Sequence, residues 1–182
     1  MHYIHRTTEY GTGDSMKETP QQYTERIRGY MAGRRPMEAL SATPRQIARL
    51  IKGITKKKLA QRPAPEAWSV TEILAHLADA EVVQSFRIRL ILGSNKTAIQ
   101  SYDQDAWAEF SDYSSHDPAL SLESFRINRE RNLRLLKSLP PKMWRRYGIH
   151  SERGKETIAR ITELMAGHDI NHANQIRRIL NR

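Results

Sequence analysis

The stretch WSVTEILAHLADAEVVQSFRIRLILG, residues 68–93, decides the fold class of this 182-residue chain. Ser69 and Glu72 have the three-residue spacing of a helix capping box, and Trp68 and Ile73 flank it as a hydrophobic staple. Apolar residues then recur at intervals of three and four up to a final glycine, which is a typical helix stop. The stretch therefore predicts one long helix with a buried apolar face.

Three further segments have the same helical periodicity, and a shorter helix-like pattern precedes them. Residues 43–60 begin with Thr43 as the expected N-cap and Pro44 in the first turn. The other two segments are residues 118–140 and 155–180. Four amphipathic helices bury their stripes most economically in a four-helix bundle. We expect an all-α bundle with a long crossover connection, residues 94–117, between helices 2 and 3, and an extra short N-terminal helix.

Composition limits the class of protein. Hydrophobic residues make up 38% of the chain, and no run approaches the roughly 18 apolar residues of a membrane span. The N-terminus lacks the apolar core of a secretory signal. The absence of cysteine excludes disulfides and thiolate metal sites. We therefore expect a cytoplasmic protein with a disordered extension over residues 1–18, a candidate natural start at Met16, and one domain over residues 19–182.

The net charge of +10 raises nucleic acid or another polyanion as a partner. Lysine and arginine are dense at residues 45–62 and 126–137, where solvated helix faces are the simplest interpretation. The sequence shows no helix-turn-helix, zinc-finger or RNA-stacking motif. We rank steering of an anionic substrate above nucleic-acid binding, and simple solubility above both. A non-catalytic basic bundle that binds a polyanion, or acts as an interaction module, is the alternative function.

Two histidines near the C-terminus lie on the apolar stripe of the last predicted helix. His168 and His172 are four residues apart in GHDINH (167–172), so both imidazoles can point to one place. Buried imidazoles need partners, which a neighbouring helix or a metal ion can supply, and the pair alone favours the first. His76, on the stripe of residues 68–93, is the candidate third ligand. Three imidazoles suit Zn, Ni, Fe or Cu and leave coordination positions open.

HDINH also resembles the zinc-protease signature H-E-x-x-H, with Asp169 in place of glutamate. Proteases with that signature take a third ligand downstream, but the tail after His172 contains no His, Asp or Glu. Aspartate is also one methylene shorter than the glutamate that would act on a metal-bound water. The protease interpretation is therefore rejected.

Several neighbouring residues have two interpretations each. His150 either overhangs the site or is an exposed loop histidine. Asp79 either supports His76 by a hydrogen bond or lies on the surface, and Asp169 faces solvent or the next helix. Trp107, in a short helix of the long connection, lines a pocket or packs against other side chains, and Gln175 is placed to hydrogen-bond within the bundle. No role is assigned to His2, His5 or His116.

With these residues placed, the chain resembles the DinB/YfiT-like superfamily of metalloenzymes. The matching blocks are WSVTEILAHLADAE (68–81), GKET (154–157) and HDINHANQI (168–176). The resemblance covers residues 36–181, nearly the whole chain. It implies a four-helix bundle, often dimeric, in which His76, His168 and His172 bind a divalent metal. Zn or Ni is expected first, with Fe or Mn as alternatives.

Relatives of known activity include thiol S-transferases that use bacillithiol and a mycothiol-dependent isomerase, and some members are described as metal-dependent hydrolases. In that chemistry the metal binds and deprotonates a low-molecular-weight thiol, which gives a thiolate nucleophile at neutral pH. The resemblance therefore implies a metal-dependent transferase, hydrolase or isomerase with a small-molecule substrate. It also implies a thiol co-substrate and a homodimer. It assigns no catalytic residue beyond the metal ligands.

Overall fold

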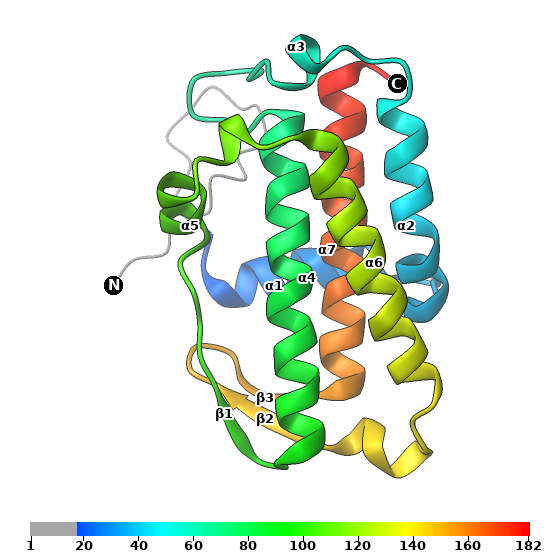
Figure 1. Cartoon of the computed structure of the whole chain (residues 1–182). Helices are drawn as coiled ribbons and strands as arrows, with labels where there is room; N and C mark the ends of the chain where they lie inside the picture. The colour runs from blue at the N-terminus through cyan, green and yellow to red at the C-terminus, as the bar shows by residue number, and fades with distance from the viewer. Residues whose placement is uncertain (1–17) are drawn as a thin grey trace.

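The computed structural model describes residues 18–182, and its main body is a bundle of four long helices (Figure 1). The four are α2 (Pro36–Ile51), α4 (Val70–Gly93), α6 (Pro118–Lys137) and α7 (Ile158–Leu180). Helix α4 contacts α6 and α7, and α2 contacts the same two helices. Each helix therefore has two neighbours in a closed ring, which confirms the predicted bundle.

Shorter elements connect and cover the bundle. They are α1 (Pro20–Gly29), α3 (Lys56–Leu59), α5 (Gln104–Phe110) and two 3₁₀ turns (Tyr113–Ser115 and Pro141–Arg145). Helix α1 crosses the bundle and packs on α7 (Figure 1). No helix formed by residues 18–182 combines the length and apolar character that a membrane crossing requires. Two predictions, the disorder of residues 1–18 and the natural start at Met16, concern the N-terminal segment. Apart from Glu18, that segment lies outside the described residues.

A small three-stranded sheet, which the all-α prediction did not include, accompanies the helical bundle. Strand β1 (Thr97–Ile99) pairs in parallel with β2 (Tyr147–His150), which pairs antiparallel with β3 (Gly154–Thr157). Strands of three or four residues are too short for an alternating pattern to be recognised. Close packing requires glycine at position 148, because a Cβ there would lie 2.4 Å from Cδ1 of Ile99. The sheet ties the connection after α4 to the segment before α7.

Helix α2 begins at Pro36, seven residues before the predicted Thr43, and Pro44 lies inside the helix. The prediction failed because proline lacks a backbone N–H wherever it lies, so its presence does not distinguish the start of a helix from its interior. Inside α2, its absence leaves the carbonyl of Leu40 without the usual partner four residues later. That carbonyl instead accepts a 3.1 Å hydrogen bond from Nη1 of Arg129 on α6. The interior proline thus exposes an acceptor that joins two helices.

The other helix boundaries follow the caps. Helix α4 has the predicted capping box, in which Ser69 and Glu72 each accept a hydrogen bond from the other's backbone N–H. The predicted segment 43–60 is divided by Gly53, whose φ of 78° ends α2 and separates it from α3. Helix α7 begins at Ile158, not at residue 155, because the preceding residues pair as β3.

Two apolar clusters fill the bundle, one at the sheet end and one at the α3 end. The first includes Ile91 and Ile158, and the second includes Leu59 and Trp68. Along α4, α6 and α7, the residues between the two clusters include polar side chains that point inward: Glu81, Arg129, Asn132, His168 and Asp169. A polar layer therefore divides the core, and the candidate site belongs to it.

Candidate metal centre

The three histidines singled out in the sequence meet inside the bundle. Helix α4 supplies His76, and α7 supplies His168 and His172. Nε2 of His168 lies 3.0 Å from Nε2 of His76 and 3.1 Å from Nε2 of His172. One candidate ligand atom from each ring lies within 4.8 Å of the others. His76 and His172 are buried, whereas His168 is partly exposed.

These distances match the spacing of ligands around one metal ion. With metal–nitrogen bonds of about 2.0–2.1 Å, neighbouring ligand nitrogens lie about 3.0–3.4 Å apart. Three neutral imidazoles present the same kind of nitrogen lone pair to one another, so they do not satisfy each other. One cation can accept all three lone pairs together. A set of three imidazoles without carboxylate suits borderline ions such as Zn²⁺ and Ni²⁺. The residues present therefore fit a divalent ion.

Gln175 orients one of the rings. Its Oε1 lies 2.9 Å from Nδ1 of His172, and an amide oxygen can only accept a hydrogen bond. Nδ1 therefore carries the proton, and the lone pair of Nε2 faces the other two histidines, as in many metal sites. The prediction that Gln175 hydrogen-bonds within the bundle is confirmed. The ring of Trp68 packs on His76 with centroids 5.0 Å apart.

Asp79 bonds to a residue that the sequence did not nominate. Its carboxylate accepts a 2.5 Å hydrogen bond from the hydroxyl of Tyr113. Burial, followed by this carboxylate, raises the pKa of Tyr113. Tyr113 in turn packs edge-on against Trp68, with ring centroids 6.4 Å apart. Asp79 is therefore linked to His76 through the rings of Tyr113 and Trp68. Neither interpretation of Asp79 from the sequence predicted this link.

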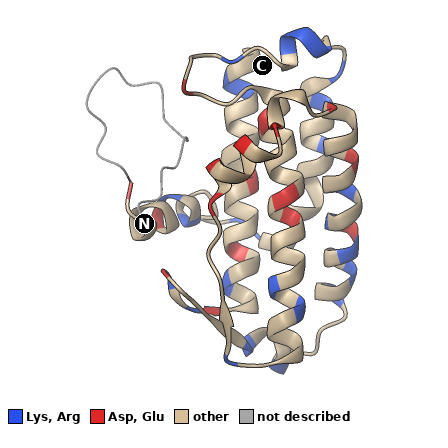
Figure 2. Cartoon of the chain, turned by 60° about the vertical axis from the view of Figure 1, so that its left-hand side comes forward, with Lys and Arg blue, Asp and Glu red and all other residues tan. Residues whose placement is uncertain are grey.

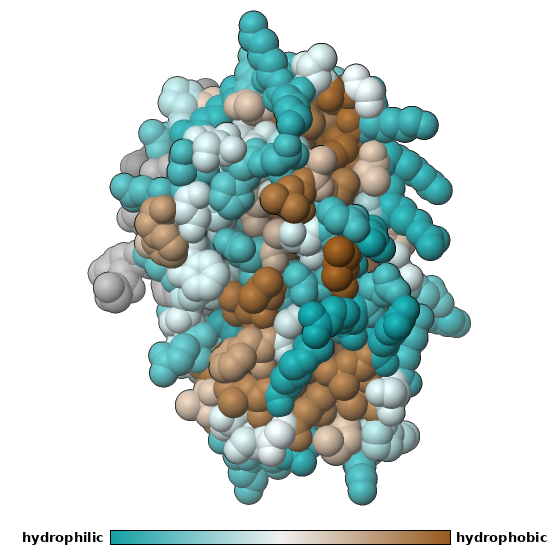
Figure 3. All heavy atoms as spheres, in the orientation of Figure 1, coloured by the Kyte–Doolittle hydropathy of each residue, from teal (hydrophilic) through white to brown (hydrophobic). Residues whose placement is uncertain are grey.

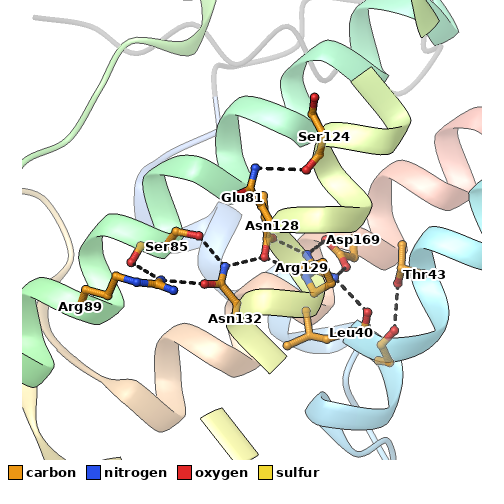
Figure 4. A network of polar contacts seen from close by, with 11 residues as sticks. Leu40, Thr43, Glu81, Ser85, Arg89, Ser124, Asn128, Arg129, Asn132 and Asp169 are labelled. Atoms are coloured by element: carbon orange, nitrogen blue, oxygen red, sulfur yellow. Dashed lines mark hydrogen bonds and ion pairs between the residues drawn. The ribbon is translucent and has the colours of Figure 1, made fainter. Parts of the chain in front are cut away.

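A second buried polar cluster includes Asp169, which follows His168 in the sequence and lines the same cavity. Figure 4 shows the side chains of this cluster. Arg129 of α6 pairs with Glu81 of α4 at 2.7 Å and with Asp169 of α7 at 2.5 Å. All three side chains are 2% exposed. Burial raises the pKa of Asp169, while the charge of Arg129 opposes that effect. Asn132 donates a 2.7 Å hydrogen bond to Glu81. Asp169 therefore faces the next helix, one of the two alternatives considered.

The sequence analysis missed this Arg129 cluster (Arg129, Glu81, Asp169 and Asn132), although one indication was visible. Arg129 lies four residues after Phe125 and four before Leu133, on the apolar stripe of α6. A charged residue at a core position requires buried partners of opposite charge. To name those partners, one must know which helices are neighbours. The periodicity of a single helix does not give that information.

A cavity of about 110 Å³ lies beside the histidine cluster, and His168 lines it. Its walls come from α1, α4, α6, α7, the segment 101–104 and the β2–β3 hairpin, with contributions from Tyr23, Arg87, His150 and Arg153. His150 is 2% exposed, so the interpretation as an exposed loop histidine is wrong. Outside the cavity, Trp107 packs on Tyr102 and Phe110, and Nε2 of His116 lies 3.0 Å from the carbonyl oxygen of Ser111.

Known proteins share both the sequence pattern and the fold. Residues 39–176 match the sequence model of the DinB superfamily. "Putative metal-dependent hydrolase YfiT" of Bacillus subtilis is 26% identical over 148 residues, covering 80% of this chain and 83% of that protein. Two proteins that are also named "Putative metal-dependent hydrolase", from Bacillus mycoides and Oceanobacillus iheyensis, are likewise 26% identical, over 140 and 139 residues. These alignments cover 77% and 76% of this chain and 80% of each relative.

A solved structure extends the likeness to three dimensions. The structure of YfiT from Bacillus subtilis, described as having an unusual four-helix bundle topology, matches this one with a TM-score of 0.75. The match covers 97% of this chain and 94% of that chain at 24% identity, and it supports the shared fold. Because the family match runs from α2 to α7, across most of the chain, this protein belongs to the DinB superfamily.

Proposed function

We propose that this protein is a divalent-metal-dependent enzyme whose metal is held by Nε2 of His76, His168 and His172. Zn or Ni is the expected ion, with Fe or Mn as alternatives. The observation that carries the proposal is the convergence of three imidazole nitrogens, at 3.0 and 3.1 Å, in the polar layer of the core. The names of the relatives, which describe metal-dependent hydrolases, support it.

The centre is suited to activating a small nucleophile. A bound divalent ion lowers the pKa of a coordinated water or thiol, so that the nucleophile is ionised near neutral pH. Gln175 fixes the ring of His172, and Trp68 packs on the ring of His76, so two of the three rings are held rigidly. His168 lines the cavity, so a substrate bound there would lie next to the centre.

The proposed nucleophile is a low-molecular-weight thiol, which gives S-transferase or isomerase chemistry on a small-molecule electrophile. Water is the second candidate, and the names of the hydrolase relatives favour it. The two are separated by incubating metal-loaded protein with an electrophilic ester in the presence and absence of a thiol. Thiol transfer to the acyl carbon yields a thioester and releases the alcohol, whereas hydrolysis yields the acid and the alcohol and proceeds equally without thiol.

We also propose a cytoplasmic homodimer. Helices α4 and α6, which are neighbours, expose the apolar side chains of Val82, Phe86, Leu120 and Ile127, between 44% and 67% exposed. Figure 3 shows apolar side chains on the face that these helices present. Exposed apolar side chains on adjacent helices suit a contact between two copies. Light scattering separates a dimer from the 21.1 kDa monomer.

A polyanion-binding bundle is the alternative, and the distribution of charge gives it less support. Basic residues of α6 are paired within the helix: Arg126 with Glu123 and Glu130, and Arg134 with Glu130. Figure 2 shows positive and negative residues interspersed along the long helices, with a run of lysines at α3. This is typical of solvated faces. No detectable DNA or RNA binding at about 50 mM salt would remove the alternative.

Elemental analysis of protein purified without added metal tests the proposal. Near-stoichiometric divalent metal is expected, and the double variant His168→Ala, His172→Ala should lose it. His116→Ala is the matched control, because this histidine lies outside the cluster and should leave the metal content unchanged. Native protein that contains no metal, and whose stability does not change when metal is added, would overturn the proposal.

A further inference from the structure

His76 differs from the other two histidines in how its position is set. His168 and His172 lie one turn apart on α7, so the backbone of a single helix fixes their spacing. His76 comes from α4, yet its Nε2 lies 3.0 Å from that of His168. Gln175 holds the ring of His172 by a hydrogen bond, whereas the ring of His76 packs against Trp68, with centroids 5.0 Å apart. The orientation of His76 therefore depends on what holds Trp68.

Tyr113 packs against Trp68 and is itself fixed by a hydrogen bond. It begins the 3₁₀ turn near the end of the long connection, and this turn packs on α4. Its ring meets the indole edge-on, with centroids 6.4 Å apart, and both side chains are buried. Its hydroxyl donates a 2.5 Å hydrogen bond to the carboxylate of Asp79. Burial, followed by this carboxylate, raises the pKa of Tyr113, so the hydroxyl remains a donor at neutral pH.

These contacts form a closed loop on α4. The loop leaves the helix at Asp79, passes through Tyr113 and Trp68, and returns at His76, three residues before Asp79. Each side chain in it is held from two sides, which limits the orientations that a ring can adopt in a close-packed interior. The contact between Tyr113 and Asp79 is a hydrogen bond, which is more directional than ring packing. Removal of one oxygen atom from Tyr113 would therefore open the loop at a single point.

We propose that Tyr113 is a positioning residue of the metal centre, whose hydrogen bond to Asp79 braces Trp68 against the imidazole of His76. The inference rests on the proposed function and adds to it a residue outside the ligand set. Tyr113 acts through other side chains, since the candidate ligands are the three histidines alone. A residue bonded directly to a ligating histidine typically changes metal affinity by about 10–100-fold, so we expect about three- to tenfold from this indirect contact.

Cobalt binding to the whole chain tests this role without requiring turnover. Titration with Co²⁺ against a competing chelator gives the dissociation constant, and the visible absorption band of the bound ion reports the geometry of its ligands. Tyr113→Phe, which removes one oxygen atom, should weaken cobalt binding about three- to tenfold and shift the band. Asp79→Leu removes the acceptor and should have the same effect. Asp79→Asn keeps an oxygen that accepts the bond, and its affinity should stay within about twofold of the unchanged protein.

Two control variants separate positioning from a general loss of stability. Tyr147→Phe also removes a tyrosine hydroxyl, but from β2, where the ring packs with Lys155. Ile91→Val removes one carbon atom from the apolar cluster at the sheet end and lowers the stability of the bundle without changing the loop. Both variants should bind cobalt as the unchanged protein does and show the same band. Urea unfolding of each metal-free variant measures the loss of stability that accompanies it.

Each outcome has a separate meaning. An unchanged cobalt affinity and band in Tyr113→Phe overturn the positioning role and leave the proposed metal centre intact. An equal loss of affinity in Ile91→Val would trace the effect to stability, and an equal loss in Asp79→Asn would trace it to the charge of the carboxylate. Either result also overturns the role. If Asp79→Leu fails to fold, Tyr113→Phe decides. Unchanged protein that binds no cobalt overturns the proposed function, and the inference falls with it.

Discussion

The histidine cluster and the Arg129 cluster share helices α4 and α7, and the Arg129 cluster adds α6, yet the two are satisfied in opposite ways. Around Arg129, each charge faces an opposite charge, and the neighbouring amide of Asn132 completes the set. In the histidine cluster, three groups of the same kind point their Nε2 atoms to one place. The first cluster contains partners of opposite charge within the protein, whereas the second is complementary to a cation. The comparison separates a polar group that holds the bundle together from one suited to a ligand.

Removing the arginine should have the largest effect on stability. Arg129→Met leaves the carboxylates of Glu81 and Asp169 buried without their cation, and we expect the free energy of unfolding to fall by about 3–5 kcal/mol. Urea unfolding measures it. Arg126→Met is the matched control on the same helix, because its partners Glu123 and Glu130 are exposed, and its cost should stay below about 1 kcal/mol. Equal losses in the two variants would contradict the assignment.

Metal should stabilise only the chain that retains its histidines. At a free metal concentration of about one hundred times the dissociation constant, Zn²⁺ or Ni²⁺ should raise the free energy of unfolding by about 2.7 kcal/mol. A chelator should reverse the gain, and the double variant His168→Ala, His172→Ala should show none. The comparison would fail if the double variant were stabilised as strongly as the unchanged protein.

Gly167, directly before His168, tests whether α1 helps to position the part of α7 that carries both clusters. A Cβ at this position would lie 2.2 Å from the carbonyl oxygen of Ile27 in α1. Gly167→Ala should therefore displace α1, cost about 1–3 kcal/mol and speed amide exchange in α1. Gly29→Ala, with no atom within 4 Å, should change stability by less than about 1 kcal/mol. Unchanged exchange in α1 would show that α7 itself moves instead.

The smallest effect concerns His150, which belongs to neither cluster. Burial and Arg153 lower its pKa from 6.5 to about 4 in the folded state. Between these values the unfolded chain binds more protons, so the contribution of His150 is complete above pH 6.5 and is lost as the pH falls towards 4. Between neutral pH and about pH 4.5, His150→Leu should lose about 1–2 kcal/mol less stability than the unchanged protein. Equal losses of stability in the two proteins between the two pH values, measured by urea unfolding, would contradict this sign.

The parts of the fold that the sequence predicted are those that depend on local spacing. The capping box at Ser69 and the apolar stripe that follows are properties of one helix, and α4 forms as expected. His168 and His172 share a face because they are four residues apart. The resemblance to the DinB superfamily supplied the same ligand set, and the structure places His76 beside these two rings.

The parts that the sequence did not predict depend on contacts between distant segments. Strand β1 exists because residues 97–99 pair with residues 148–150, about fifty positions later, and neither segment has a strand pattern of its own. Pro44 was interpreted as the start of a helix. The sequence does not show that the carbonyl of Leu40, which Pro44 leaves without a helical partner, bonds to Arg129 on another helix. His150 was expected in a loop, since only the pairing of β2 with two neighbours buries it.

Helix α1 has a consequence for the rate at which ligands exchange. It forms one wall of the cavity but stands outside the ring of four helices, and half-exposed Arg28 is one of its links to α7, through Glu163. Separation of α1 would leave the histidines in their places on α4 and α7. We therefore expect substrate entry and product release to follow a local opening, at a free-energy cost well below that of unfolding the bundle. In the proposed enzyme, the turnover rate would then depend on how firmly α1 is attached as well as on the chemistry at the centre.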